Sequence, residues 1–217
     1  MKSTLARSLA ARLCALGLLA GATATAAEPP LAGDAAAGAA KAAVCGACHG
    51  PTGNSVNPEW PNLAGQGHEY TALQLRLLKA GVRIAPTMAP MALPLGDQDI
   101  ADLAAHFEKQ VPAGLEADAA LWQAGERLFR GGDAGRAIPA CSGCHGPTGR
   151  GNGPAHWPQI HGQHALYTSS QLKNFASRTR YVATAAAPPQ AEIMSDIAQR
   201  LSDADVKALA AYLQGLR

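Results

Sequence analysis

The sequence predicts an all-α protein built from two tandem copies of one helical domain. One observation is an internal duplication, in which residues 45–53 match residues 141–149 and residues 60–66 match residues 157–163. The other is the recurrence of apolar residues every three or four positions in several segments, which indicates helices. No segment shows a convincing alternation of apolar and polar residues, so strands are not expected.

The first 27 residues have the layout of a secretory signal peptide. Three basic residues come first, a short apolar run follows at residues 13–20, and small residues end at Ala26 or Ala27. The run is much shorter than the roughly 20 residues that span a bilayer. We therefore expect residues 1–27 to be removed during export, which predicts a periplasmic protein.

The remaining chain divides near Pro112 and Gly114, because both residue types end a helix and mark a linker. We place an N-terminal domain at residues 28–112 and a C-terminal domain at residues 113–217. The apolar spacing predicts helices over residues 35–44, 68–79 and 100–107, and over the corresponding residues 121–129, 164–177 and 206–213. Ser202 with Asp205 three residues later resembles a capping box at the start of the last helix.

Each copy of the repeat contains one Cys-x-x-Cys-His motif. The motif residues are Cys45, Cys48 and His49, and Cys141, Cys144 and His145. Residues i and i+3 lie on the same face of a helical turn, so the two thiols of a motif can form thioethers with the two vinyl groups of one haem. The histidine that follows is then placed as an axial ligand of the iron. The motifs therefore predict two covalently bound haem c groups.

Other uses of four cysteines fit less well. Two disulfides would be usual in an exported protein, but they would not require a histidine after each pair. A zinc site would need the two pairs about 15 to 20 residues apart, whereas they are nearly a hundred apart. A thioredoxin-like redox pair belongs to a strand-rich α/β context, which is absent here.

Methionine is the sixth ligand that the repeat indicates. Met88 lies nine residues before Asp97, and Met194 lies nine residues before Asp203. This matched register favours Met88 and Met194 as axial ligands, because His/Met ligation is common in cytochromes c. Met91 is close enough to Met88 to compete with it, and core filling is the alternative role for any of these residues.

Two prolines also recur after the motifs, at Pro61 and Pro158. An axial histidine needs an acceptor for its other ring nitrogen, and we expect the carbonyls of these prolines to accept from His49 and His145. The alternative is that both are ordinary turn prolines.

Several polar and aromatic residues that could contact haem propionates recur as well. They are Arg83 and Arg180, Tyr70 and Tyr167, and Trp60 and Trp157. Ordinary packing is an equally good reading of each. The remaining histidines have no histidine counterpart in the other repeat, so we expect them to be surface or packing residues; they are His68, His106, His156, His161 and His164.

The charge of the chain is small. The formal net charge is +2, and loss of Lys2, Arg7 and Arg12 with the signal peptide would leave −1. No basic patch indicates nucleic-acid binding. Residues 28–112 have a net charge of −3 and residues 113–217 have +2, an asymmetry that would orient the protein in the field of a partner.

Taken together, these features resemble the dihaem cytochrome c4 family. The resemblance rests on the two Cys-x-x-Cys-His motifs, the paired Trp-Pro-x-Leu/Ile-x-Gly-Gln stretches, the methionine nine residues before an acidic helix start, and the closing residues 211–216. It implies two class I cytochrome c-type domains that pack about a pseudo-twofold axis. It also implies the iron ligands His49, Met88, His145 and Met194, and passage of electrons toward terminal oxidases. The proline-rich residues 185–189 depart from the pattern shortly before Met194.

The expected function is therefore electron transfer without a catalytic residue. The partners would be redox proteins such as a membrane cytochrome complex, a terminal oxidase or a dehydrogenase, and we expect a monomer with at most peripheral membrane association. One alternative is the cytochrome subunit of a periplasmic dehydrogenase, such as a flavocytochrome sulfide dehydrogenase. A dihaem peroxidase is a weaker alternative, because it needs an open iron position.

Overall fold

The computed structural model describes residues 31–217, so the predicted signal peptide lies outside the described residues. The N-terminal half contains α1 (Ala35–Lys41), α2 (Ala43–His49), α3 (His68–Lys79), α4 (Ala89–Ala92) and α5 (Asp97–Glu108). The C-terminal half contains α6 (Trp122–Gly131), the 3₁₀ turn η1 (Ala134–Arg136), α7 (Ser142–His145), α8 (Ala165–Ala176), α9 (Pro189–Ala198) and α10 (Asp203–Gly215). Residues 31–217 contain isolated β-bridges but no strand, which confirms the all-α prediction.

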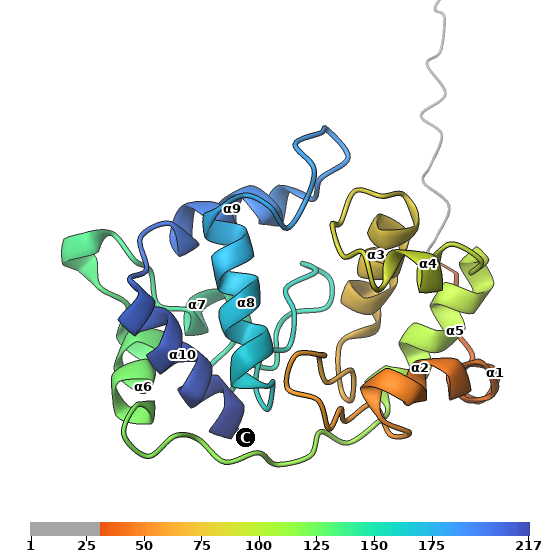
Figure 1. Ribbon diagram of the computed structural model, residues 1–217, viewed down its shortest axis with the longest axis horizontal. Coiled ribbons are helices and arrows are strands. Elements are labelled where there is room, and N and C mark those ends of the chain that lie inside the picture. The colour runs from red at the N-terminus through yellow and green to blue at the C-terminus, as the bar shows by residue number, and fades with distance from the viewer. Residues whose placement is uncertain (1–30) are drawn as a thin grey trace, which may run out of the picture. The chain divides into compact units, whose positions relative to one another are not determined.

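In each half the first and last helices cross at a glycine. α1 packs against α5, and α6 packs against α10 (Figure 1). A Cβ on Gly38 would lie 2.0 Å from the carbonyl oxygen of Asp102, and a Cβ on Gly125 would lie 2.0 Å from that of Ala208. Since neither backbone leaves room for a methyl group, glycine is what allows both crossings.

The apolar stripes of α5 and α10 form the centres of the two cores. Leu103 and Phe107 are 2% and 3% exposed, and the C-terminal core gathers Leu209 with Phe129 of α6. Burying a side chain of this size contributes about 1.5–3 kcal/mol. The apolar residues whose spacing predicted helices at residues 100–107 and 206–213 are therefore the residues whose side chains are buried.

A buried carboxylate ties α1 to α5. Asp102 is 2% exposed, and it accepts hydrogen bonds from the Lys41 ammonium at 2.7 Å, the Asp34 backbone N–H at 2.8 Å and the Gln98 amide at 2.8 Å. These donors, Lys41 foremost, hold the pKa of Asp102 down to about 2. The carboxylate therefore stays ionised at neutral pH and fixes the N-terminal helix.

The last helix of each half begins with a comparable cap. The Ser202 hydroxyl accepts from the Asp205 N–H at 3.2 Å, and the Asp205 carboxylate accepts from the Ser202 N–H at 2.8 Å. This confirms the predicted capping box. At the start of α5, Gly96 has no hydroxyl, and only the return bond from its N–H to Asp99 is formed, at 2.9 Å.

The two copies of the repeat differ before the cysteine motif. α1 and α2 follow one another with only Ala42 between them, whereas ten residues separate α6 from α7. Part of this insertion forms η1, where Arg136 pairs with Asp133 and with Asp205 of the α10 cap. The longer route therefore adds a contact to α10.

Residues 31–217 form one compact unit, and hydrogen bonds join its two halves reciprocally. The Gln163 side chain accepts from the Asn62 N–H at 2.9 Å and donates to the Asn62 carbonyl at 3.0 Å. Gln66 makes the same pair of bonds with the backbone of Gln159, both at 2.9 Å. Because Asn62 and Gln159 occupy matching places in the repeat, as do Gln66 and Gln163, the contact follows the pseudo-twofold relation implied by the resemblance.

No helix between residues 31 and 217 has the length and apolar character needed to cross a membrane.

We predict that Gly125→Ala destabilises the protein, because the added Cβ would clash with the Ala208 carbonyl. Overpacking of this kind typically costs about 1–3 kcal/mol or more. Gly131→Ala is the matched control, since Gly131 also lies in α6 and its Cβ would meet no atom within 4 Å. Denaturant unfolding of the two variants measures the difference, and equal stability would contradict the close helix crossing.

Candidate haem sites

The two motif histidines are buried and oriented in the same way. His49 is 4% exposed and its Nδ1 lies 2.9 Å from the Pro61 carbonyl oxygen, while His145 is 7% exposed and its Nδ1 lies 3.0 Å from that of Pro158. A carbonyl oxygen can only accept, so Nδ1 donates and the neutral ring keeps its lone pair on Nε2. The predicted role of both proline carbonyls is confirmed.

Burial keeps these imidazoles neutral. It lowers the pKa of His49 and of His145 below the usual value, although the bond to the proline carbonyl acts in the opposite direction. Each histidine therefore presents an uncharged Nε2 donor at neutral pH, which is the form that binds iron.

Each motif histidine is the last residue of a helix; Cys45 and Cys48 lie inside α2, whereas Cys141 is the N-cap of α7 and Cys144 lies inside it. α2 ends at His49 and α7 ends at His145, and the next residues, Gly50 and Gly146, have φ values of 77° and 79°. Glycine adopts this left-handed region without strain. The chain thus turns away immediately after the ligand, and the two thiols and the imidazole of each motif are held on one short helical segment.

The thiols do not have the character of a redox-active pair. Cys45, Cys48, Cys141 and Cys144 are all free in the described part of the chain. Burial raises the pKa of Cys45, and it raises the pKa of Cys141 to about 11. Thioredoxin-like cysteines have a lowered pKa, so the geometry disfavours that alternative.

The proposed methionine ligands occupy different local structures. Met88 is half-buried at the residue before α4, whereas Met194 is half-buried inside α9. Met91, the competitor of Met88, is 41% exposed. The residues that follow the two methionines keep the repeat register, because Ala92 and Ala198 lie four residues later and are 0% and 1% exposed.

The proline-rich departure near residue 188 turns out to start a helix. Pro188 precedes α9 and Pro189 is its first residue. Proline suits that position, because its fixed φ is helical and it lacks an N–H that would have no partner there. The sequence reading missed α9, although this proline signal could have indicated it.

The surroundings of the motifs fit a haem. Several apolar side chains close in sequence to the first cysteine motif and to Met88 are exposed, among them Val44 at 58%, Val56 at 95%, Ile84 at 48% and Leu93 at 59%. Exposed apolar surface of this kind is expected where a porphyrin packs.

Arg180 is 4% exposed, and its Nη1 is buried without a hydrogen-bond partner. An anionic group such as a haem propionate would satisfy it.

Two of the other histidines singled out in the sequence have roles in the contact between the halves or at the surface. His164 donates through Nε2 to the Ser55 carbonyl of the other half at 2.9 Å, and His68 lies at the surface beside Glu69 and Glu108. Trp60 and Trp157 are half-buried. Packing and surface roles were expected for the histidines.

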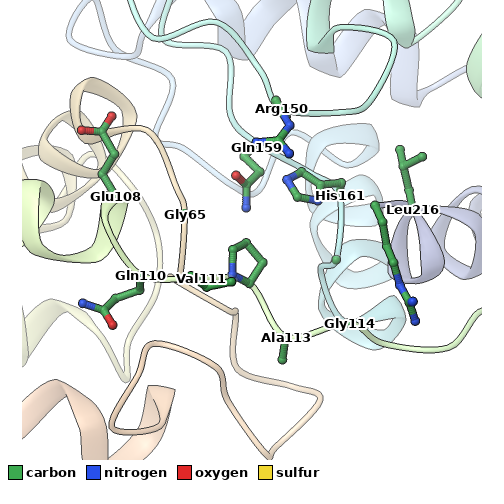
Figure 2. Close-up of a pocket in the computed structure, with 13 residues that line it drawn as sticks. Gly65, Glu108, Gln110, Val111, Ala113, Gly114, Arg150, Gln159, His161 and Leu216 are labelled. Atoms are coloured by element: carbon green, nitrogen blue, oxygen red, sulfur yellow. The ribbon is translucent and has the colours of Figure 1, made fainter.

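A cavity of about 600 Å³ lies beside the linker and is not a haem site. Its lining includes Val111, Pro112, Arg150 and His161, and none of the motif cysteines, motif histidines or methionines (Figure 2). This cavity therefore contributes none of the candidate haem-binding residues.

Comparisons with known proteins agree with this geometry. The cytochrome c family model matches residues 34–110 and 123–217. The chain is 47% identical to cytochrome c4 of Azotobacter vinelandii over 194 residues, which cover 85% of this chain and 90% of the relative. It is 37% identical to a thiosulfate dehydrogenase electron acceptor of Thiomonas intermedia, with 82% of this chain and 81% of the relative covered.

A solved structure is similar over the same region. The crystal structure of reduced cytochrome c4 from Pseudomonas stutzeri superposes with a TM-score of 0.79 at 45% identity, covering 86% of this chain and all of that chain. Two matched cytochrome c segments, each with its own Cys-x-x-Cys-His motif, correspond to two covalently bound haem c groups.

We predict that each motif attaches one haem independently. The double variant Cys141→Ala/Cys144→Ala should retain a single covalent haem, because the thioethers of the other motif remain. Mass measurement of the denatured polypeptide and a haem-to-protein ratio check this, and Ser142→Ala, which alters the same motif but keeps both of its thiols, is the control that leaves both haems. Two covalent haems in the double variant would contradict the assignment.

Proposed function

The chain belongs to the cytochrome c4 family, and from this premise we propose that it is a periplasmic carrier that passes electrons between respiratory-chain proteins, toward a terminal oxidase. Electron transfer itself follows from the two haem c groups and the family. The observation that carries the proposal is the presence of two Cys-x-x-Cys-His motifs, each with a buried, oriented histidine, in one compact unit.

We propose His49 with Met88 and His145 with Met194 as the axial ligands of the two irons. Half-burial of both methionines and their matched register before α5 and α10 support this choice over Met91. The haem iron supplies the one-electron change, and His/Met ligation raises its reduction potential. A closed sixth position also disfavours a peroxidase.

The protein's own groups hold and orient the cofactors. The thiols of each motif would fix a haem covalently, and the carbonyls of Pro61 and Pro158 hold the imidazoles in one tautomer and one orientation. A ligand set that keeps its position when the iron changes oxidation state keeps the reorganisation energy of electron transfer small. No acid–base or nucleophilic group is needed for this role.

The periplasmic location is supported by the signal-peptide pattern of residues 1–27 and by the cysteine motifs. Nothing in the pattern of residues 28–217 calls for an integral anchor, and we propose at most peripheral contact with the membrane.

A second candidate is the cytochrome partner or subunit of a periplasmic dehydrogenase. The similarity to a thiosulfate dehydrogenase electron acceptor favours a donor that oxidises sulfur compounds. A flavocytochrome sulfide dehydrogenase is another enzyme of that kind. In this role the protein would receive electrons directly from the enzyme, and it could still pass them onward.

The ligand proposal predicts different outcomes for two neighbouring methionines. Met88→Leu should remove half of the weak near-infrared absorption of Met-ligated ferric haem and lower one reduction potential, because leucine cannot bind iron. Met91→Leu is the matched control and should leave both unchanged. Loss of the band in Met91→Leu instead would transfer the ligand role to Met91.

The partner proposal predicts that the reduced protein is reoxidised by membranes containing a terminal oxidase. The readout is oxygen uptake that depends on added protein, and boiled membranes are the control. The dehydrogenase alternative predicts that thiosulfate dehydrogenase with thiosulfate reduces the ferric protein, and that the protein co-purifies with a dehydrogenase. Co-purification without oxidation by membranes would favour the alternative.

A further inference from the structure

The cavity of about 600 Å³ beside the linker is lined by both halves of the protein (Figure 2). Gly65 belongs to the N-terminal half, residues 110–114 form the linker, and His161 and Leu216 belong to the C-terminal half. We call this space the linker cavity. Its volume is that of a pocket for a small organic molecule, and none of the candidate haem-binding residues lines it, so its chemistry is separate from that of the irons.

Hydrogen bonds hold the walls of the linker cavity in place. The Asn54 side chain donates to the Val111 carbonyl at 3.0 Å and accepts from the Ala113 N–H at 2.7 Å, so the linker is fixed to the N-terminal half. The Gln159 N–H donates to the Gln66 side chain at 2.9 Å, which fixes another part of the lining. The cavity is therefore preformed, as ligand sites usually are.

One imidazole in the wall lacks a hydrogen-bond partner. His161 is 8% exposed, and its Nε2 is buried with no partner among residues 31–217. A buried polar atom costs free energy unless a partner bonds to it. The matching residue of the other repeat is Ala64, so the same turn forms there without an imidazole. The packing of this turn therefore does not account for His161, and a ligand in the cavity would supply the missing bond.

The charges beside His161 favour an anion. Arg150 lines the cavity and forms no ion pair with an aspartate or glutamate between residues 31 and 217. Burial lowers the pKa of His161, and the positive charge of Arg150 lowers it as well. Glu108 also lines the cavity, but Figure 2 shows it well away from Arg150 and His161, and it already accepts from the His68 N–H at 3.1 Å.

We propose that the linker cavity binds a small organic anion, whose carboxylate or phosphate group bonds to Arg150 and His161 and whose apolar body packs against Pro112 and Leu216. A guanidinium makes charge-assisted bonds to either anionic group, and an imidazole nitrogen that carries its proton donates to the same oxygens. The bound anion contacts both halves and the linker, so it stabilises their arrangement. The proposal is independent of which proteins exchange electrons with the haems.

The test is isothermal titration calorimetry of the holoprotein with benzoate and with phenyl phosphate, which carry the two anionic groups on the same apolar ring. At least one of them should bind with one-to-one stoichiometry. Benzamide has nearly the shape of benzoate without its charge, and it should bind at least about tenfold more weakly than the anion, because bonds to a charged group are lost. Binding of neither anion, or binding of benzamide as tight as that of the anions, would overturn the proposal.

Arg150→Gln should weaken binding of the anion by about tenfold or more, because it removes the charged donor. Arg127→Gln is the matched control. Arg127 is also exposed and without a described carboxylate partner, but it does not line the cavity. Its loss removes the same formal charge and should change the affinity by less than about twofold, because salt screens distant surface charges. Equal losses in the two variants would show attraction by net charge alone and contradict the site.

His161→Ala tests the buried imidazole separately. It places the residue of the other repeat at this turn, so the variant should fold and keep both haems. Its affinity for the anion should fall by about tenfold, and unchanged affinity would contradict the role of His161. The haem absorption spectrum is recorded during each titration and should stay constant. A spectral change that accompanies binding would place the anion at an iron and overturn the proposed site.

Discussion

The hydrogen bond from each motif histidine to a proline carbonyl is the interaction on which the sites depend. Nδ1 of His49 and of His145 is occupied at 2.9 and 3.0 Å, so only Nε2 is left as a metal donor. Burial removes the charged form of the ring. The same bond links the helix that bears the cysteines to the loop behind it, and the position of that loop in turn depends on the packing of the half around it.

The helix crossings at Gly38 and Gly125 lie away from the motif histidines but fix the packing of each half. They bring the first helix of each half against the last at a separation that only glycine allows. The cysteine motif follows directly from that crossing in the N-terminal half and after an insertion in the C-terminal half. Similar sites are therefore reached by two different routes, and the two copies share the helix crossing and the motif but differ in the connection between them.

Contact between the halves is polar, reciprocal and built from repeated residues. Gln66 and Gln163 each bond the backbone of the opposite half, and Arg83 and Arg180 each bond a tyrosine of the opposite half. A duplicated chain obtains such pairs because one self-complementary contact is satisfied twice. This contact also concentrates two guanidinium groups where no described carboxylate neutralises them, which makes the interface an electrostatic feature as well as a structural one.

The sequence alone determined the first, middle and last helices of each half and the two cysteine–histidine motifs, because these depend on spacings of three or four residues within one segment, and it showed the duplication directly. It also indicated both proline carbonyls, because the prolines recur in the repeat, and the cap at Ser202, because Asp205 follows three residues later. It did not indicate α9 around Met194, nor which tyrosine each arginine contacts. The helix α9 has a local signal in Pro188 and Pro189, whereas the arginine–tyrosine contacts join residues 84 and 110 positions apart across the two halves, and only the tertiary structure decides such contacts.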